Sequence, residues 1–239
     1  MVCIVTIKLR GSSERFYMGE DSQQFKGQIG QTIAESEPWF QEPEHPGQDA
    51  PNVVVVLLDD TGFSQLGCFG SSIDTNNIDS LASGGLQFTN FHVTPLCSPT
   101  RASLLTGRSQ HAVGMRSVSN FKTGFPNMLG HITNRAATIS EILNSEGYAT
   151  FCLGKWHLAP MEDCSAAGPF TQWPLGRGFD RFYGFLDGET DQFNPSLTKD
   201  NHHIDPPAKP EDGYHLSEDL VDNFFSMVSD LKGVRPDRP

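Results

Sequence analysis

Long hydrophobic runs are missing from this 239-residue sequence. The longest purely aliphatic run, 53–58, is far shorter than the roughly 20 apolar residues that cross a membrane as a helix. The start of the chain, 1–10, has a short apolar patch but lacks the small-residue cleavage site of a signal peptide. From these absences we expect no membrane partner and a cytoplasmic location.

Basic residues are scarce. The chain has 17 Lys and Arg against 29 Asp and Glu, a formal net charge of −12. This balance argues against the broad basic surface that binds nucleic acid, so no nucleic-acid partner is expected. A small anionic substrate is not excluded, because a local cluster of two or three cations can outweigh the net field.

Cysteines are also few, and their pattern is irregular. There are five, an odd number, and no Cys-x-x-Cys occurs; they are Cys3, Cys68, Cys97, Cys152 and Cys164. The pattern favours neither a disulfide framework nor a structural zinc site. We therefore expect a reducing compartment.

The first 50 residues differ in texture from the rest of the chain. They are polar, and four prolines fall within 37–51. We interpret 1–50 as a polar, Pro-rich N-terminal extension and 51–239 as one domain. The apolar stretch 52–58 predicts a strand buried on both faces, and the alternating stretch 86–93 predicts a second strand.

Several helices are expected between and after these strands. Short helices are expected at 78–82 and, after Pro99, at 100–105. Thr138 and Glu141 form a capping-box pattern that begins another helix. A further buried strand is expected at 148–153.

The last part of the chain is expected to be mostly irregular over 154–214, which is rich in Gly, Pro and Asp. A final amphipathic helix is expected from a Ser217 cap to Gly233. Strands that alternate with helices predict an α/β fold with a mainly parallel sheet. No strand follows the final helix, so we expect the chain to end within its fold.

Two carboxylates, Asp59 and Asp60, follow the expected strand at 52–58. Ligands of open α/β sheets bind beyond the carboxyl ends of the strands. Adjacent carboxylates there suit a hard cation such as Ca²⁺ or Mg²⁺. A turn or a helix cap is the alternative, because Asp is common in both.

Lys155 and His157 follow the expected strand at 148–153. In an extended chain both side chains point to the same side. A cation beside an imidazole suits an anionic, oxygen-rich substrate. A surface lysine and a capping histidine are the alternative.

Cys97 stands just before the helix expected at 100–105, whose N-terminus favours anions, and Arg101 lies one turn further on. A buried, inert cysteine is the alternative. Thiolate phosphatases place five residues between Cys and Arg, whereas three intervene here. Thiolate catalysis is therefore not expected.

The sequence C-S-P-T-R-A-S-L-L-T-G-R at 97–108 resembles the sulfatase signature C-x-P-x-R followed by L-L-T-G-R. A second sulfatase signature resembles 147–157, which ends in G-K-W-H, and 51–63 is similar to the first metal-binding strand of that family. The resemblance covers roughly 52–239 and looks most like bacterial arylsulfatases. It implies an alkaline-phosphatase-like α/β/α sandwich, with 51–239 as the N-terminal part of the catalytic domain.

The resemblance also implies a reaction, the hydrolysis of a small-molecule sulfate ester. Cys97 would be converted to formylglycine by formylglycine-generating machinery, and its hydrate would attack sulfur. Asp59, Asp60 and the modified Cys97 would bind a Ca²⁺ ion.

The remaining roles implied by the resemblance concern three side chains. Arg101 would hold the hydrate, and Lys155 would contact both the hydrate and the sulfate. His157 would assist the loss of sulfate. A hydrate offers both a nucleophile and a way to break the covalent intermediate.

The family uses further groups that this sequence does not supply. They are a later Asp-Asn pair on the metal, a later His for the leaving alcohol and a second Lys on the sulfate. The pair at 222–223 is interpreted instead as the polar face of the final helix. We therefore expect an incomplete fragment with weak or no activity. A non-catalytic truncated product and a phosphoesterase or phosphonate hydrolase of the same superfamily are the alternatives.

Overall fold

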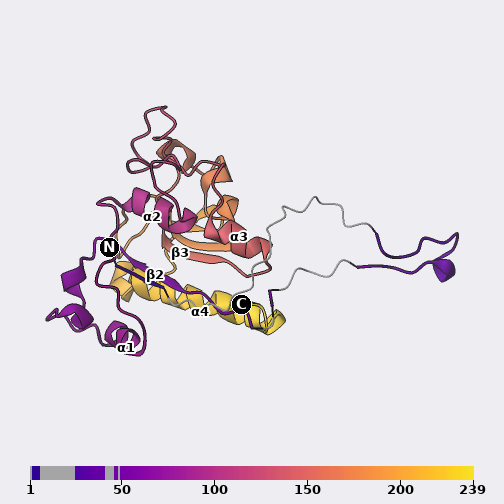
Figure 1. Ribbon diagram of the computed structural model, residues 1–239, viewed down its shortest axis with the longest axis horizontal. Helices are drawn as coiled ribbons and strands as arrows, with labels where there is room; N and C mark the ends of the chain where they lie inside the picture. The colour runs from indigo at the N-terminus through magenta and orange to yellow at the C-terminus, as the bar shows by residue number, and fades with distance from the viewer. Residues whose placement is uncertain (1, 6–24, 41–45, 48) are drawn as a thin grey trace.

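The computed structural model describes residues 2–5, 25–40, 46–47 and 49–239. The expected N-terminal extension therefore lies partly outside the described residues. Its described stretch 25–40 extends away from the rest of the chain, at the far right of Figure 1. There Gln28 and Glu37 form an isolated β-bridge, and the Phe25 ring lies edge-on to Trp39.

The main sheet has four strands in the order β3-β4-β5-β6. These are β3 (Phe151–Lys155), β4 (Arg181–Phe185), β5 (Leu197–Lys199) and β6 (His202–Ile204). Only the β3–β4 pairing is parallel among the described strands, so the sheet is mixed.

The stretch 154–214 is mostly irregular, as expected, but three short strands that the sequence did not predict, β4, β5 and β6, lie within it. Glycine allows the parallel pair to form closely. Gly184 of β4 pairs with Gly154 of β3, and the Gly154 backbone leaves no room for a Cβ at Gly184. A stretch rich in glycine can therefore contain a closely paired strand as well as loops.

Two apolar clusters enclose the main sheet. The larger contains Trp156, Trp173 and Phe182, which are almost fully buried. The smaller lies between the sheet and α4 (Leu216–Val234), where Leu216 and Met227 are buried. Figure 1 shows α4 running along one side of the sheet.

The helix ends are only partly as expected. Thr138 caps α3 (Ile139–Ser145) and forms the capping box with Glu141, which confirms that prediction. The cap of α4 is His215 rather than Ser217, because Nδ1 of His215 accepts the Ser217 amide at 3.2 Å. Neither helix, nor any other helix in the described ranges, is long and apolar enough to cross a membrane.

The region before α2 (Cys97–Thr106) is much less enclosed. β2 (Val55–Leu58) pairs antiparallel with β1 (Val2–Val5), and α1 (Asn76–Gly84) follows. The expectation of a strand buried on both faces is wrong, since Val55 and Val56 are 41% and 45% exposed. A two-stranded ribbon has too few neighbours to cover both of its faces.

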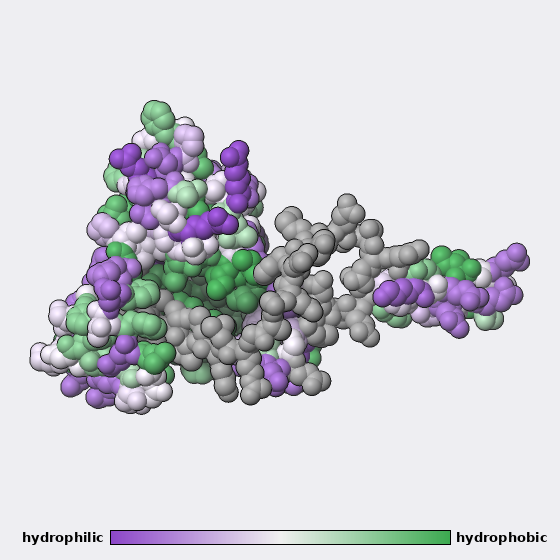
Figure 2. All heavy atoms as spheres, viewed as in Figure 1, coloured by the Kyte–Doolittle hydropathy of each residue, from purple (hydrophilic) through white to green (hydrophobic). Residues whose placement is uncertain are grey.

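The strand expected at 86–93 is also absent from the structure. Its alternating apolar side chains are exposed; they are Leu86, Phe88 and Phe91. No described strand pairs with this segment, so alternation alone does not produce a strand. Figure 2 shows apolar atoms exposed in the hollow of the molecule.

Candidate active site

The N-terminus of α2 places Cys97 against His157. The helix begins at Cys97, three residues earlier than expected, with Leu96 as the N-cap and Pro99 within the first turn. This position suits proline, because first-turn amides have no partner within the helix. Cys97 Sγ lies 3.1 Å from Nδ1 of His157.

Ser98 connects this helix to two other segments. Its side chain is fully buried, its Oγ donates to the carbonyl of His157 at 2.7 Å, and the same Oγ accepts the amide of Ser119 at 3.1 Å. One hydroxyl therefore fixes α2, the end of β3 and the loop before Asn120 to one another.

The chain turns sharply after β3. His157 has φ +52°, so the chain does not stay extended beyond Lys155. The amide of His157 donates to the carbonyl of Leu186 at 3.0 Å, which keeps the turn beside β4. Lys155 then points toward Asp59, whereas His157 points toward Cys97.

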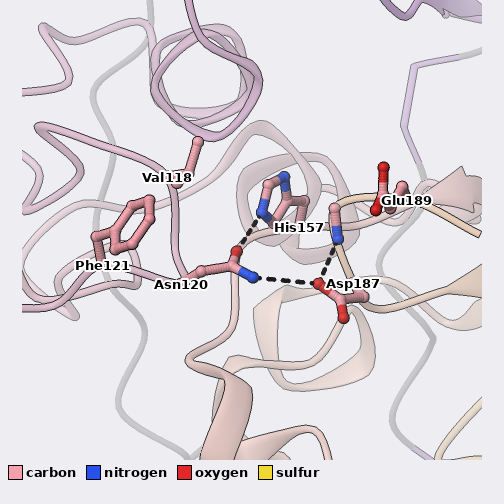
Figure 3. A pocket seen from close by; sticks show the side chains of 7 residues that line it. Val118, Asn120, Phe121, His157, Asp187 and Glu189 are labelled. Atoms are coloured by element: carbon pink, nitrogen blue, oxygen red, sulfur yellow. Dashed lines mark hydrogen bonds between the residues drawn. The ribbon is translucent and has the colours of Figure 1, made fainter.

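The other edge of the imidazole faces a pocket of about 350 Å³. Asn120 Oδ1 lies 2.6 Å from Nε2 of His157, and Asn120 Nδ2 lies 3.4 Å from Oδ1 of Asp187 (Figure 3). Val118 and Phe121 form an apolar wall of the same pocket.

Burial keeps the imidazole neutral. His157 is only 4% exposed. Burial and then the positive charge of Lys155 lower the pKa of His157 to about 4, although Asp187 acts in the opposite direction. At neutral pH the ring therefore carries one proton and can accept a second.

A cluster of three charges lies behind the Cys97–His157 pair. Lys155 Nζ donates to Asp59 Oδ2 at 2.7 Å, and Arg101 Nη2 lies 3.7 Å from Asp59 Oδ1. Arg101 Nη1 also donates to the carbonyl of Lys155 at 2.7 Å. Two buried cations against one partly exposed carboxylate leave a net positive charge, which suits an anionic group.

The pKa values of this cluster reflect both burial and charge. Burial raises the pKa of Asp59, but the hydrogen bond and charge of Lys155, together with Arg101, outweigh it and lower the pKa overall. Burial lowers the pKa of Arg101 more than Asp59 raises it. Arg101 Nε is buried without a hydrogen-bond partner among the described residues.

The two candidate metal ligands are not placed alike. Asp59 is in ion pairs, whereas Asp60 is exposed, with φ +48°. Within the described ranges no three His, Cys, Asp or Glu side chains are grouped as metal ligands. Ca²⁺ takes about six to eight oxygens, so these residues do not by themselves fit a calcium ion.

The other cysteines with described side chains are unpaired and do not take part in this arrangement. Burial raises the pKa of Cys152 to about 12 and that of Cys164 to about 11. Burial also raises the pKa of Cys68. All three are therefore thiols at neutral pH.

The structure brings together five of the six predicted site residues and leaves Asp60 aside; the five are Asp59, Cys97, Arg101, Lys155 and His157. Sequence reasoning missed Ser98, Asn120 and Asp187. Ser98 lies inside the recognised C-S-P-T-R motif, which could have drawn attention to it. Asn120 carries no such signal, because its partner is 37 positions away.

This arrangement of two cations and a neutral imidazole at the start of a helix suits a small anionic group. Comparison with known proteins agrees: the family model described as Sulfatase matches residues 51–239. The chain therefore belongs to the sulfatase family, and its α/β fold is of the alkaline-phosphatase-like class.

Individual relatives show how much of the family this chain represents. Human arylsulfatase A is 39% identical over 165 residues, which cover 68% of this chain and 30% of the relative. The arylsulfatase of Klebsiella aerogenes is 30% identical over 181 residues, which cover 75% of this chain and 37% of the relative. The chain thus spans only about a third of the length of these relatives.

A solved structure is similar over a comparable stretch. The crystal structure of Ps i-CgsB matches with a TM-score of 0.61 and 28% identity, covering 74% of this chain and 41% of that chain. Its complex with k-i-k-neocarrahexaose matches with a TM-score of 0.60.

Proposed function

We propose that this chain carries part of the active site of an arylsulfatase-like sulfuric ester hydrolase, with Cys97 as the residue that is converted to formylglycine. The observation that carries the proposal is the placement of Cys97 against His157 with Arg101 on the same helix face. When formed, formylglycine supplies a hydrated aldehyde, with one hydroxyl as nucleophile and a second for release of sulfate.

The cations of the site would bind the substrate. Lys155 and Arg101 carry positive charge beside the N-terminus of α2, where the helix itself favours an anion. Arg101 Nε is a buried donor without a partner among the described residues, so it is free to donate to an anionic group bound at the site. Charge of this kind stabilises a transition state that places negative charge on sulfate oxygens.

His157 would move a proton. Its Nδ1 is 3.1 Å from the side chain at position 97, within reach of a hydroxyl proton there. Because its pKa is about 4, the ring is neutral at neutral pH, with one nitrogen free to accept a proton. We assign it the role of base in the release of sulfate.

We also propose that Asp59 and Asp60 contribute to a Ca²⁺ site that needs additional oxygen ligands. The described residues do not complete such a site. Asp59 would have to loosen its contact with Lys155 before it could bind the ion. We therefore expect weak turnover from these 239 residues alone.

The first test is chemical. The chain is co-expressed with a formylglycine-generating enzyme, and its peptides are analysed by mass spectrometry. We expect conversion at Cys97 and unmodified thiols at Cys152 and Cys164. A thiol at Cys97 as the sole product would contradict the proposal.

The second test is activity. Turnover of an aryl sulfate and of an aryl phosphate is compared for the converted chain, with Cys97→Ala as the inactive control. Slow, Cys97-dependent turnover of the sulfate ester is the expected result. A preference for the phosphate ester would instead support a phosphoesterase of the same superfamily.

A further inference from the structure

Each nitrogen of the His157 imidazole has a different partner. Nδ1 faces Cys97 Sγ at 3.1 Å, and Nε2 faces Asn120 Oδ1 at 2.6 Å. The contact at Nε2 is the shorter of the two, and it comes from a loop that no recognised motif includes. Figure 3 shows this contact at the pocket.

Asp187 decides which atom of the Asn120 amide faces the imidazole. Asn120 Nδ2 is 3.4 Å from Asp187 Oδ1 and 3.1 Å from Met161 Sδ, and both of these atoms are acceptors. The reverse orientation would place the amide oxygen against a carboxylate and a thioether. The amide therefore keeps its NH₂ toward Asp187 and its carbonyl toward His157.

Asp187 and the imidazole are themselves fixed. The amide of Gly188 donates to Asp187 Oδ1 at 2.6 Å. Gly188 also lies close against the ring, since a Cβ there would be 2.8 Å from Cε1 of His157. On the other side, Ser98 anchors the backbone of both Ser119 and His157.

The tautomer follows from these contacts. A carbonyl oxygen only accepts, so the hydrogen bond to Asn120 requires the proton on Nε2. A neutral ring with its proton on Nε2 has a lone pair on Nδ1. That lone pair points to position 97, where the thiol of Cys97 donates in the unmodified chain.

We propose that Asn120, oriented by Asp187, is a positioning residue that fixes His157 in the Nε2–H tautomer and keeps Nδ1 available to accept a proton from residue 97. Its importance for turnover rests on the proposed function, whereas the tautomer itself does not. Asn120 acts through His157 and touches no reacting atom.

The experiment detects the imidazole N–H proton directly. The 239-residue chain is labelled with ¹⁵N-histidine, and the N–H signal of His157 is recorded at pH 7 and assigned with His157→Gln. We expect a proton bonded to Nε2 and protected from exchange with water. Asn120→Leu has nearly the same shape but no acceptor, and should lose this protected signal.

An internal control exists in the same chain. Asn90 Oδ1 lies 2.7 Å from Nε2 of His92 at an exposed position. Asn90→Leu should leave the His157 signal unchanged. Cys97→Ala should also leave the proton on Nε2, because Asn120 rather than Cys97 sets the tautomer.

Three results would overturn the proposal: a proton on Nδ1 in the unaltered chain, a protected Nε2–H that persists in Asn120→Leu, or its loss in Cys97→Ala. If Asn120→Leu does not fold, Asp187→Ala is tested instead. This substitution frees the Asn120 amide to rotate and should weaken the protected Nε2–H signal of His157.

Activity provides a separate measurement. In the formylglycine-containing chain, Asn120→Leu should lower kcat by about tenfold or more, as expected for impaired proton transfer, with KM nearly unchanged. Failure of Cys97 to be converted to formylglycine would contradict the proposed function but leave the N–H result standing. A proton found on Nδ1 would contradict this inference but not the proposed function.

Discussion

Two strands place the site residues on either side of α2, and the surroundings of these strands differ greatly. β3 pairs with β4, is covered by α4 and leads into His157, which is 4% exposed. β2 pairs only with β1 among the described strands, and it leads into the partly exposed Asp59 and the exposed Asp60.

The difference shows that the two sides of Cys97 are not equally prepared for chemistry. On the imidazole side, Ser98, Asn120 and His157 are fixed by hydrogen bonds from three segments. On the carboxylate side, the side chain of Asp59 is restrained among the described residues only by Lys155 and Arg101, and Asp60 lacks a described side-chain partner. We infer that the proton-transfer part of the site is preformed and that the metal part is not.

The largest expected effect concerns the pH dependence of stability on the imidazole side. His157 has an ordinary pKa of 6.5 and a pKa of about 4 in the fold. Between these pH values the unfolded chain binds a proton that the folded chain does not. The free energy of unfolding should therefore fall as pH drops from 6.5 to 4, by on the order of 3 kcal/mol.

Urea unfolding at several pH values measures this slope. His157→Gln should remove most of it, whereas His92→Gln, at an exposed position, should not. His131, whose pKa is also lowered by burial, accounts for part of the remaining slope. An unchanged slope in His157→Gln would mean that the imidazole side is less enclosed than the structure indicates.

A smaller effect is expected at Ser98. Ser98→Ala leaves the carbonyl of His157 and the amide of Ser119 without this partner in a buried place. We expect a loss of about 1–3 kcal/mol in the free energy of unfolding. Ser83→Ala is the matched control, since its hydroxyl bonds to Ser80 in an exposed part of α1 and should cost less than about 0.5 kcal/mol. Equal losses would remove the distinction between the two regions.

The sequence predictions also differ in outcome between features set by local sequence and features set by long-range packing. Local chemistry was sufficient for the capping box of Thr138 and Glu141, because both partners lie within one turn. The motif at 97–101 and the G-K-W-H sequence identified residues that the structure does bring together. In the capping box the short-range pattern is itself the cause of the structure, whereas the motif residues were found through their resemblance to a family and meet through long-range packing, as Cys97 and His157 do.

The remaining sequence predictions failed because they depended on long-range packing. The burial of Val55 and Val56, and the absent strand at 86–93, depend on which neighbours cover them, and no local pattern contains that information. Asn120 was missed because its contact with His157 is decided by Asp187, 67 positions further along the chain.

The Asp59–Lys155 ion pair should show an effect smaller still. Lys155 is buried, but the Asp59 carboxylate is 34% exposed, so water and salt weaken the pair. A double-mutant cycle with Asp59→Asn and Lys155→Met should give a coupling energy of about 1 kcal/mol. The more exposed pair Lys122–Glu162 is the control and should give a value near zero. A coupling of several kcal/mol would show that the carboxylate side is as rigid as the imidazole side.

The smallest effect on stability is expected at Asp60, although this residue tests the metal side most directly. Asp60→Asn should change the free energy of unfolding by less than about 0.5 kcal/mol, since the side chain is exposed and makes no described contact.

Calorimetry with Ca²⁺ should show weak binding, at about millimolar concentration or above, because two carboxylates leave most of the coordination shell to water. Asp59→Asn and Asp60→Asn should each weaken Ca²⁺ binding further. Micromolar binding would show that the metal side is preformed after all, and binding that survives both substitutions would mean that other residues are the ligands.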